Sequence, residues 1–154
     1  MKLLAACAAL AIVTASLPAF AQETRLRSAR VSATDVPKTA AFYEATFGLK
    51  EVRKVDRDGK PFEIIMNYGA TAKEAEESKA TKLVVILRAK DAPAPSVSNL
   101  VFEVKDLDAV IAKAKGAGGT LSRPENKSST SGSRVAFVKD PDGNEIELIQ
   151  PPKG

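Results

Sequence analysis

The sequence predicts an α+β fold built from two successive β-α-β-β-β halves, and three observations support this prediction. Each half opens with a strand-like segment that leads into an amphipathic helix capped by an aspartate. Each helix is followed by three further strand-like segments. Placing Asp35 on Asp106 aligns the two halves along their length. Such self-similarity indicates a duplicated supersecondary unit whose two copies bury their apolar faces together.

The first half is expected to begin with a strand over residues 27–32, where apolar and polar side chains alternate. Asp35 is a typical helix N-cap residue, and Pro37 suits the first helical turn. Gly48 then ends the helix. The apolar residues between them recur every three or four positions, which predicts one buried helix face made of Val36, Ala40, Tyr43 and Phe47.

Three further strands are expected in the first half. The segment Arg57-Asp58-Gly59-Lys60 is a tight-hairpin signal between the first two of them. Residues 70–81 are polar and rich in Lys and Glu, which fits a loop or, alternatively, a short exposed helix. The expected strands cover residues 49–56, 61–68 and 83–88.

The second half repeats this order after a Pro-containing linker over residues 91–98. Asp106 caps its helix, and the glycines from Gly116 onward end it. A Ser-rich loop is expected over residues 125–133, and residues 140–144 supply the turn before the last strand. The expected helix face comprises Leu107, Val110, Ile111 and Ala114. The expected strands cover residues 99–104, 120–122, 134–139 and 145–150.

Residues 1–21 have the form of a secretory signal peptide. Lys2 precedes an apolar run that ends at Pro18, and Ala19-Phe20-Ala21 is an A-x-A cleavage signal. The run is shorter than the ~20 residues that span a bilayer. We therefore expect cleavage after Ala21, a domain over residues 22–154, and a periplasmic or secreted protein with no membrane attachment. A lipid anchor on Cys7 is a minor alternative.

The composition excludes several kinds of chemistry. The chain has no histidine and one cysteine, so Ser-His-Asp triads, Cys-His pairs, imidazole metal ligands and intrachain disulfides are all absent. The formal net charge is +4 at pH 7, without a concentrated basic cluster. Nucleic acid is therefore not an expected partner, because its recognition needs a concentrated basic stripe or patch.

The closing segment, Phe137-Val138-Lys139-Asp140-Pro141-Asp142-Gly143-Asn144-Glu145-Ile146-Glu147-Leu148-Ile149, resembles the glyoxalase/bleomycin-resistance/extradiol-dioxygenase superfamily. The helix opening over residues 35–49 is similar to glyoxalase I (lactoylglutathione lyase) in particular. The resemblance covers about residues 26–150. It implies the vicinal oxygen chelate fold, in which two mixed sheets curl into a cup with helices outside. Module one would then span about residues 26–90 and module two about 99–150.

The resemblance also implies four metal-binding positions, which in this chain are Ser28, Ile86, Asn99 and Glu147. Zinc or nickel sites need three or four nitrogen or oxygen donors. Only Glu147 is a strong ligand, so we expect a degenerate metal site and no cofactor. The family's glutathione-binding positions hold Ser32 and Lys90, which speaks against glutathione chemistry.

Strand alternation places further residues in the same cup. The predicted ligand-binding residues are Arg30, Arg88, Asn99, Glu103 and Glu147. Arginine suits carboxylate recognition because its guanidinium forms paired hydrogen bonds. Glu147 would orient a donor group or act as a catalytic base. The alternative is that the arginines merely pair with Glu103 or Glu147 and fill a vacated site. The opposite, helix-covered face would carry Ala29, Val31, Leu83, Val85, Leu87, Leu100, Phe102, Val104, Ile146 and Leu148.

These observations predict an exported, metal-free, glyoxalase-like protein that binds a small molecule, with an anion as a candidate ligand, and that forms a homodimer. One alternative is a lyase or isomerase of the glyoxalase I type that uses Glu147. A second alternative is a dimeric interaction module without a ligand. Bleomycin-type sequestration fits less well, because a basic protein suits a cationic drug poorly.

Overall fold

The computed structural model describes residues 27–92, 100–128 and 132–152. The predicted signal peptide, residues 93–98 of the predicted linker and Asn99 lie outside these ranges. The first module comprises β1 (Ser28–Ala33), α1 (Val36–Phe47), β2 (Leu49–Arg57), β3 (Lys60–Tyr68), α2 (Ala72–Glu77) and β4 (Lys82–Leu87). The second comprises β5 (Leu100–Glu103), α3 (Leu107–Gly116), β6 (Thr120–Lys127), β7 (Arg134–Lys139) and β8 (Glu145–Gln150).

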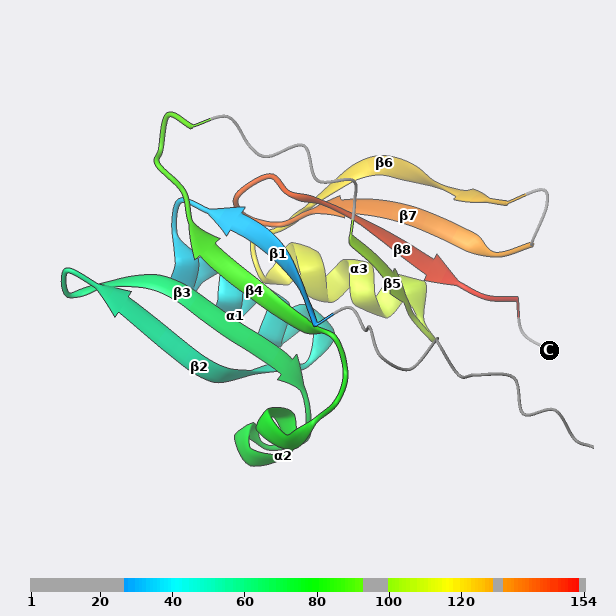
Figure 1. Cartoon of the computed structure of the whole chain (residues 1–154). Coiled ribbons are helices and arrows are strands. Elements are labelled where there is room, and N and C mark those ends of the chain that lie inside the picture. Colours follow the sequence, from blue (N-terminus) through cyan, green and yellow to red (C-terminus); the bar gives the residue numbers. More distant parts are fainter. Residues whose placement is uncertain (1–26, 93–99, 129–131, 153–154) are drawn as a thin grey trace, which may run out of the picture.

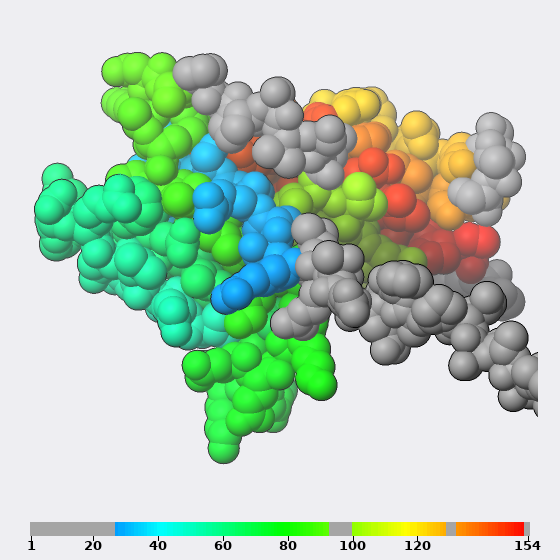
Figure 2. Space-filling model, viewed as in Figure 1, coloured from blue at the N-terminus to red at the C-terminus, as the bar shows by residue number. Residues whose placement is uncertain are grey.

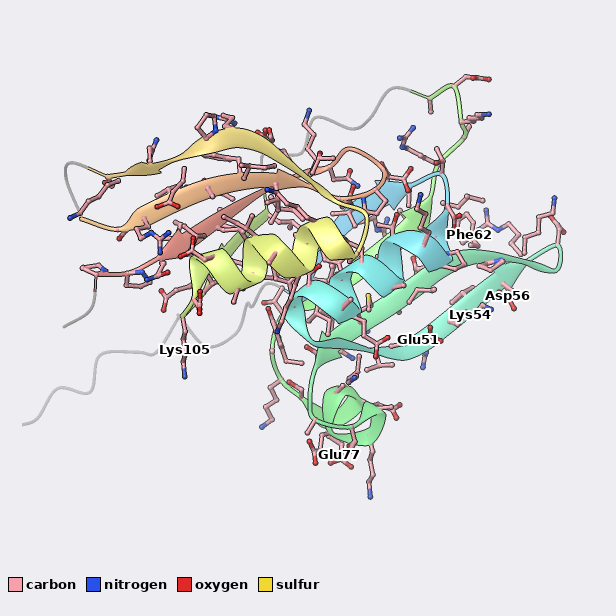
Figure 3. The ribbon with its side chains drawn as sticks, turned by 180° about the vertical axis from the view of Figure 1, so that it is seen from behind. Glu51, Lys54, Asp56, Phe62, Glu77 and Lys105 are labelled. Carbon is pink, nitrogen blue, oxygen red and sulfur yellow. The ribbon has the colours of Figure 1, made fainter. Side chains whose placement is uncertain are left out.

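Each module forms one four-stranded mixed sheet. The strand orders are β1-β4-β3-β2 and β5-β8-β7-β6, and in each sheet the first pair is parallel and the others antiparallel. Figure 1 shows the edge strands β1 and β5 on the inner sides of the two sheets, with α1 and α3 behind them. The two helices pack against each other, as the view from behind shows (Figure 3). The predicted α+β fold of two modules with helices outside is confirmed.

The two long helices begin and end where the sequence predicts. The Asp35 side chain accepts a hydrogen bond from the Lys38 backbone amide, and Asp106 accepts one from that of Ala109. Gly48 closes α1 in the left-handed region, at φ 73°, which a glycine adopts without steric cost. Helix α3 ends at Gly116.

Residues 72–77 form the short helix α2, so the helical alternative for this polar segment is the correct one. Thr71 caps it by accepting from the Glu74 amide, and the Glu74 side chain accepts from the Ala70 amide. The buried Asn67 amide group donates to the carbonyls of Ala75 and Ser78, at 3.0 and 3.1 Å. These tertiary bonds hold a segment too short to be helical alone.

The main core lies between the helices and the sheets. Its sheet side contains the alternating residues predicted for the helix-covered face, with Val31, Leu83, Val85, Val104, Ile146 and Leu148 buried and Ala29, Leu100 and Phe102 packed against them. Leu87 departs from the prediction, since this last residue of β4 is 40% exposed. The packed face therefore ends before the strand does.

Strand β6 runs to Lys127, well beyond the predicted residues 120–122. It pairs with β7 through two register shifts and contains Pro124. An edge strand tolerates a proline and bulges because one side of it needs no ladder hydrogen bonds. Within the part of the chain that the structure describes, no helix is long and apolar enough to cross a membrane.

The turn over residues 140–144 docks the second module onto the first. Asp142 accepts hydrogen bonds from the Thr34 amide and hydroxyl, both at 2.6 Å, and from the Thr39 hydroxyl at 2.7 Å. The Asn144 side chain donates to the Ser32 carbonyl at 3.0 Å. The Tyr43 hydroxyl donates to Asp140 at 3.2 Å. The family-like motif is therefore a structural junction between the modules.

Candidate functional site

The face of the first sheet that points away from α1 carries a hollow of about 300 Å³, which we call the basic hollow. Figure 2 views the molecule from this side, with β1 in blue and β4 in green. Strands β1, β2, β3 and β4 supply most of its wall, and α2 supplies one residue. The lining residues are Arg27, Ser28, Arg30, Val52, Arg53, Glu63, Ile65, Glu76, Lys82 and Val84.

One cross-strand row forms the floor of the basic hollow. Arg30 on β1 lies opposite Val84 on β4, Val84 lies opposite Ile65 on β3, and Ile65 lies opposite Arg53 on β2. Residues that are directly opposite one another on adjacent strands point to the same side of a sheet. The row therefore presents a cation at each end and two aliphatic side chains in the middle.

A β-bulge in β2 brings Arg53 to this face. The register shifts between Glu51 and Arg53, so both Val52 and Arg53 stand across from Ile65. Glu51 and Lys54 lie along the opposite side of the sheet, in a groove beside α1, where Figure 3 shows them from behind. Unbroken alternation would have placed Arg53 on the Glu51 side. The bulge thus turns a charged residue from the helix side into the hollow.

The charge of the basic hollow is unbalanced. Four cationic side chains line it against two carboxylates, Glu63 and Glu76. Arg30 approaches Glu63 at 3.8 Å, with the Arg30 side chain 63% exposed and that of Glu63 19% exposed. In residues 27–92, 100–128 and 132–152, the other three cations, Arg27, Arg53 and Lys82, form no ion pair. The hollow therefore offers positive charge to a ligand.

Arg30 is the predicted ligand-binding residue that lines the basic hollow, and its ion-pair partner is Glu63 rather than Glu103 or Glu147. Arg88 lies at the module junction instead. Its guanidinium donates to the carbonyls of Ala92 and Asp142, both at 3.3 Å, and lies 3.6 Å from the Asp142 carboxylate. With 17% of its side chain exposed, Arg88 connects the modules and is not part of the hollow.

Glu147 and Glu103 lie on the second sheet. Glu147 on β8 is opposite Val101 and Phe137, and Glu103 on β5 is opposite Ile149. Neither residue lines the basic hollow. Asn99 lies outside the described residues. Of the other four predicted ligand-binding residues, one, Arg30, lines the basic hollow.

A separate charged cluster occupies the second sheet beside Glu147. Arg123 pairs with Glu145 at 2.5 Å and covers the Phe137 ring at 3.8 Å. Hydrogen bonds from Ser122 and Arg123 lower the pKa of the Glu145 carboxyl. Arg123 therefore already has an anion and an aromatic ring as partners, whereas Arg27, Arg53 and Lys82 of the basic hollow form no ion pair within the described residues.

The described residues at the family's metal positions do not fit a divalent cation. Ser28 lies in the basic hollow opposite Lys82, Ile86 is flanked by Ser32 and Glu63, and Glu147 is on the other sheet. A hydroxyl, a hydrocarbon and a single carboxylate are too weak a donor set. Among the residues that the structure describes, no three His, Cys, Asp or Glu side chains gather where they could hold a metal ion.

Sequence reasoning missed Arg53, Glu63, Lys82 and Arg27 as site residues. Glu63 and Lys82 could have been found by extending the alternation of β4 to its partner strand and to its first residue, because Lys82 and Val84 share a face. Arg53 carries no such signal, since its orientation depends on the bulge.

Paired β-α-β-β-β modules with helices outside and a ligand-sized hollow on the exposed sheet face define a glyoxalase-like protein. The chain belongs to the Glyoxalase/Bleomycin resistance protein/Dioxygenase superfamily, whose family model matches residues 25–148. This result confirms the resemblance of the closing motif.

Curated relatives of the chain are lactoylglutathione lyases. It is 24% identical over 132 residues to lactoylglutathione lyase GLX1 of Arabidopsis thaliana. This alignment covers 75% of this chain but 40% of the plant protein. The chain therefore spans less than half the length of that relative. It is 28% identical over 120 residues to a probable lactoylglutathione lyase of Vibrio cholerae, covering 75% of this chain and 83% of the relative.

Solved structures give the same fold. A glyoxalase/bleomycin resistance protein/dioxygenase family enzyme from Burkholderia phytofirmans PsJN superposes with a TM-score of 0.65 at 15% identity, covering 84% of this chain and all of that one. TnmS3, an antibiotic binding protein from Streptomyces sp. CB03234, superposes with a TM-score of 0.59 at 25% identity, covering 84% of this chain and 97% of that one.

Proposed function

We propose that this protein binds a small anionic molecule in the basic hollow, without a metal ion. The observation that carries the proposal is the set of three cations, Arg27, Arg53 and Lys82, that stand without ion-pair partners in the described part of the chain, around an aliphatic floor. Isolated charges near a low-dielectric wall attract counter-charges strongly. A pocket that combines apolar walls with a few charged groups is typical of small-molecule sites.

The resemblance to TnmS3 supports the binding function, since that protein is an antibiotic binding protein of the same fold. We also propose that the chain is exported, on the strength of residues 1–21. The protein would then meet its ligand outside the cytoplasm. Export would favour a binding protein over an enzyme of cytosolic metabolism.

Isothermal titration calorimetry of residues 22–154 with small carboxylates tests the binding function. We expect saturable binding that Arg53→Met weakens by about tenfold or more, because a charge-assisted hydrogen bond contributes about 1.5–3 kcal/mol. Arg57→Met is the matched control, since Arg57 lies at the end of the same strand over the Phe62 ring and outside the hollow. Equal losses in the two variants, or no binding of any anion, would refute the proposal.

A second candidate is lactoylglutathione lyase activity, which the names of the curated relatives favour. The weak donor set at the metal positions speaks against it. Turnover of methylglyoxal with glutathione, measured with and without added Ni²⁺ or Zn²⁺, separates the two functions. Metal-dependent turnover that Glu147→Gln abolishes, together with stoichiometric metal in the purified protein, would establish the lyase instead.

A further inference from the structure

The cross-strand row in the basic hollow has a cation at each end and hydrocarbon between them, and this arrangement favours some anions over others. Its two ends are the guanidinium groups of Arg30 and Arg53, and its middle is Val84 and Ile65. Val84 is 5% exposed and Ile65 is half-buried. A ligand that lies across the strands along this row meets a cation, then hydrocarbon, then a second cation.

We propose that the ligand is a linear dicarboxylate whose two carboxylates bind Arg30 and Arg53 and whose methylene chain lies over Val84 and Ile65. This inference rests on the proposed anion-binding function and names its ligand class. A monocarboxylate would leave one guanidinium without a partner. A branched or polar body would lose contact with the aliphatic floor.

The sheet sets the length of the ligand. Arg30 and Arg53 are three strand spacings apart, and at ~4.8 Å per spacing their Cα atoms are separated by about 14 Å. Both side chains are long enough to lean over the hollow toward each other. A dicarboxylate of roughly four to eight carbons spans the remaining distance between the guanidinium groups.

The neighbouring charges strengthen the preference for a dianion. Arg27 and Lys82 stand beside the row, where the Lys82 amide donates to the Arg27 carbonyl at 3.1 Å. The Arg30–Glu63 ion pair is long and its arginine is mostly exposed. Such a pair contributes little, so a ligand carboxylate can share Arg30 with Glu63 or displace that glutamate.

Calorimetric titration of residues 22–154 with two matched series tests the proposal. The first series is succinate, glutarate, adipate and suberate; the second is the monocarboxylates of the same chain lengths. We expect one dicarboxylate to bind at least tenfold tighter than its monocarboxylate. Arg30→Met and Arg53→Met should each abolish that preference, Arg30→Lys and Arg53→Lys should restore part of it, and Arg57→Met should leave it unchanged. Circular dichroism confirms that each variant is folded.

The outcomes separate the ligand class from the function. Equal binding of both series to the unmodified protein, through the basic hollow, would overturn the dicarboxylate proposal and leave anion binding in place. A dicarboxylate preference that survives Arg53→Met would overturn the assignment to this row. Failure of every carboxylate in both series to bind would overturn the dicarboxylate proposal and the anion-binding function together.

Discussion

Glu63 limits the positive charge of the basic hollow. It is the more buried partner of the Arg30 ion pair, and it lies two residue pairs along the sheet from the Arg53–Ile65 pair, on the same face. A carboxylate at this position repels an incoming anion and competes with it for Arg30. We therefore expect Glu63 to lower the affinity of the basic hollow for an anion.

The variant Glu63→Gln should bind carboxylates roughly threefold to tenfold tighter than the unmodified protein, since it removes a negative charge at short range from a partly screened site. Calorimetry at fixed ionic strength measures the change. Glu51→Gln, on the opposite side of the sheet, is the control and should have no effect. Weaker binding in Glu63→Gln would mean that the carboxylate contacts a donor group of the ligand.

Asp142 is the residue on which docking of the two modules depends most. Burial alone would raise the pKa of its carboxyl, but hydrogen bonds from Thr34 and Thr39 outweigh burial and lower it. Asp140 differs, because burial raises its pKa despite hydrogen bonds from Asn144. The two aspartates of one turn thus respond to acid in opposite ways.

Replacing Asp142 by alanine should lower the free energy of unfolding by about 2–4 kcal/mol, because the Thr34 amide and hydroxyl, the buried Thr39 hydroxyl and the Arg88 guanidinium lose a partner at once. Urea denaturation followed by circular dichroism measures the loss. Asp56→Ala removes an exposed aspartate with one long contact to Lys54 at 3.8 Å and should stay within about 0.5 kcal/mol. Similar losses in both variants would show that the turn is not a junction.

Acid should weaken the junction that Asp142 forms between the modules. The folded pKa of Asp142 is below its ordinary value of 3.8. The stability it contributes is therefore complete above the unfolded pKa and is lost as pH falls through the folded pKa. The stability difference between the unmodified protein and Asp142→Asn should shrink below about pH 4. A difference that is constant from pH 7 to pH 2 would contradict the role of the charged carboxylate.

At the level of single elements, the short helix α2 depends on one buried side chain. Asn67 is fully buried and its amide group donates to two carbonyls in and after α2. Gly69 lies so close to α2 that an added Cβ would clash with the Ala75 backbone nitrogen. Helix α2 in turn contributes Glu76 to the basic hollow.

We expect Asn67→Ala to release α2 without unfolding the sheets. Hydrogen exchange should quicken by more than tenfold at the amides of residues 74–77, because the local opening free energy falls by at least about 1.4 kcal/mol. Asn126→Ala on the exposed edge strand β6 is the control. Unchanged hydrogen exchange in α2 would show that contacts other than those of Asn67 are enough to hold the helix in place.

The long helices, most of the strands and most of the core face could be predicted because each follows a local rule, whereas the end of β6 and the exposure of Leu87 could not. Asp35 and Asp106 have side chains that cap helices, and the apolar residues of each element repeat with the period of a helix or of a strand. Arg53 could not be assigned, because whether a strand contains a bulge is decided by pairing with β3 and not by its own residues. The position of Arg88 at the module junction could not be foreseen for a similar reason, since its partner Asp142 comes from the other module.

For the molecule as a whole, the two modules have different structural roles. The first carries the basic hollow, and the second docks onto it through the turn over residues 140–144. The metal positions of the family fall on both sheets, whereas the hollow belongs to one. The proposed ligand site therefore does not depend on the family's metal positions in the second module.

The proposed export of the chain can also be tested directly. Expression of the full sequence in a bacterial host should give a product that begins at Gln22 and collects in the periplasmic fraction or the medium. Mass spectrometry of the purified fraction identifies the new N-terminus. An uncleaved chain in the cytoplasm would contradict the signal-peptide interpretation.

Amide chemical shifts of isotope-labelled protein, recorded during titration with adipate, test the proposed anion-binding site most directly. Binding in the basic hollow predicts saturable shifts centred on residues 28–30, 52–53, 63–65 and 82–84, with the second sheet unaffected. Shifts that centre instead on Glu147 and its neighbours in β5 and β8 would contradict the assignment of the site to the first module.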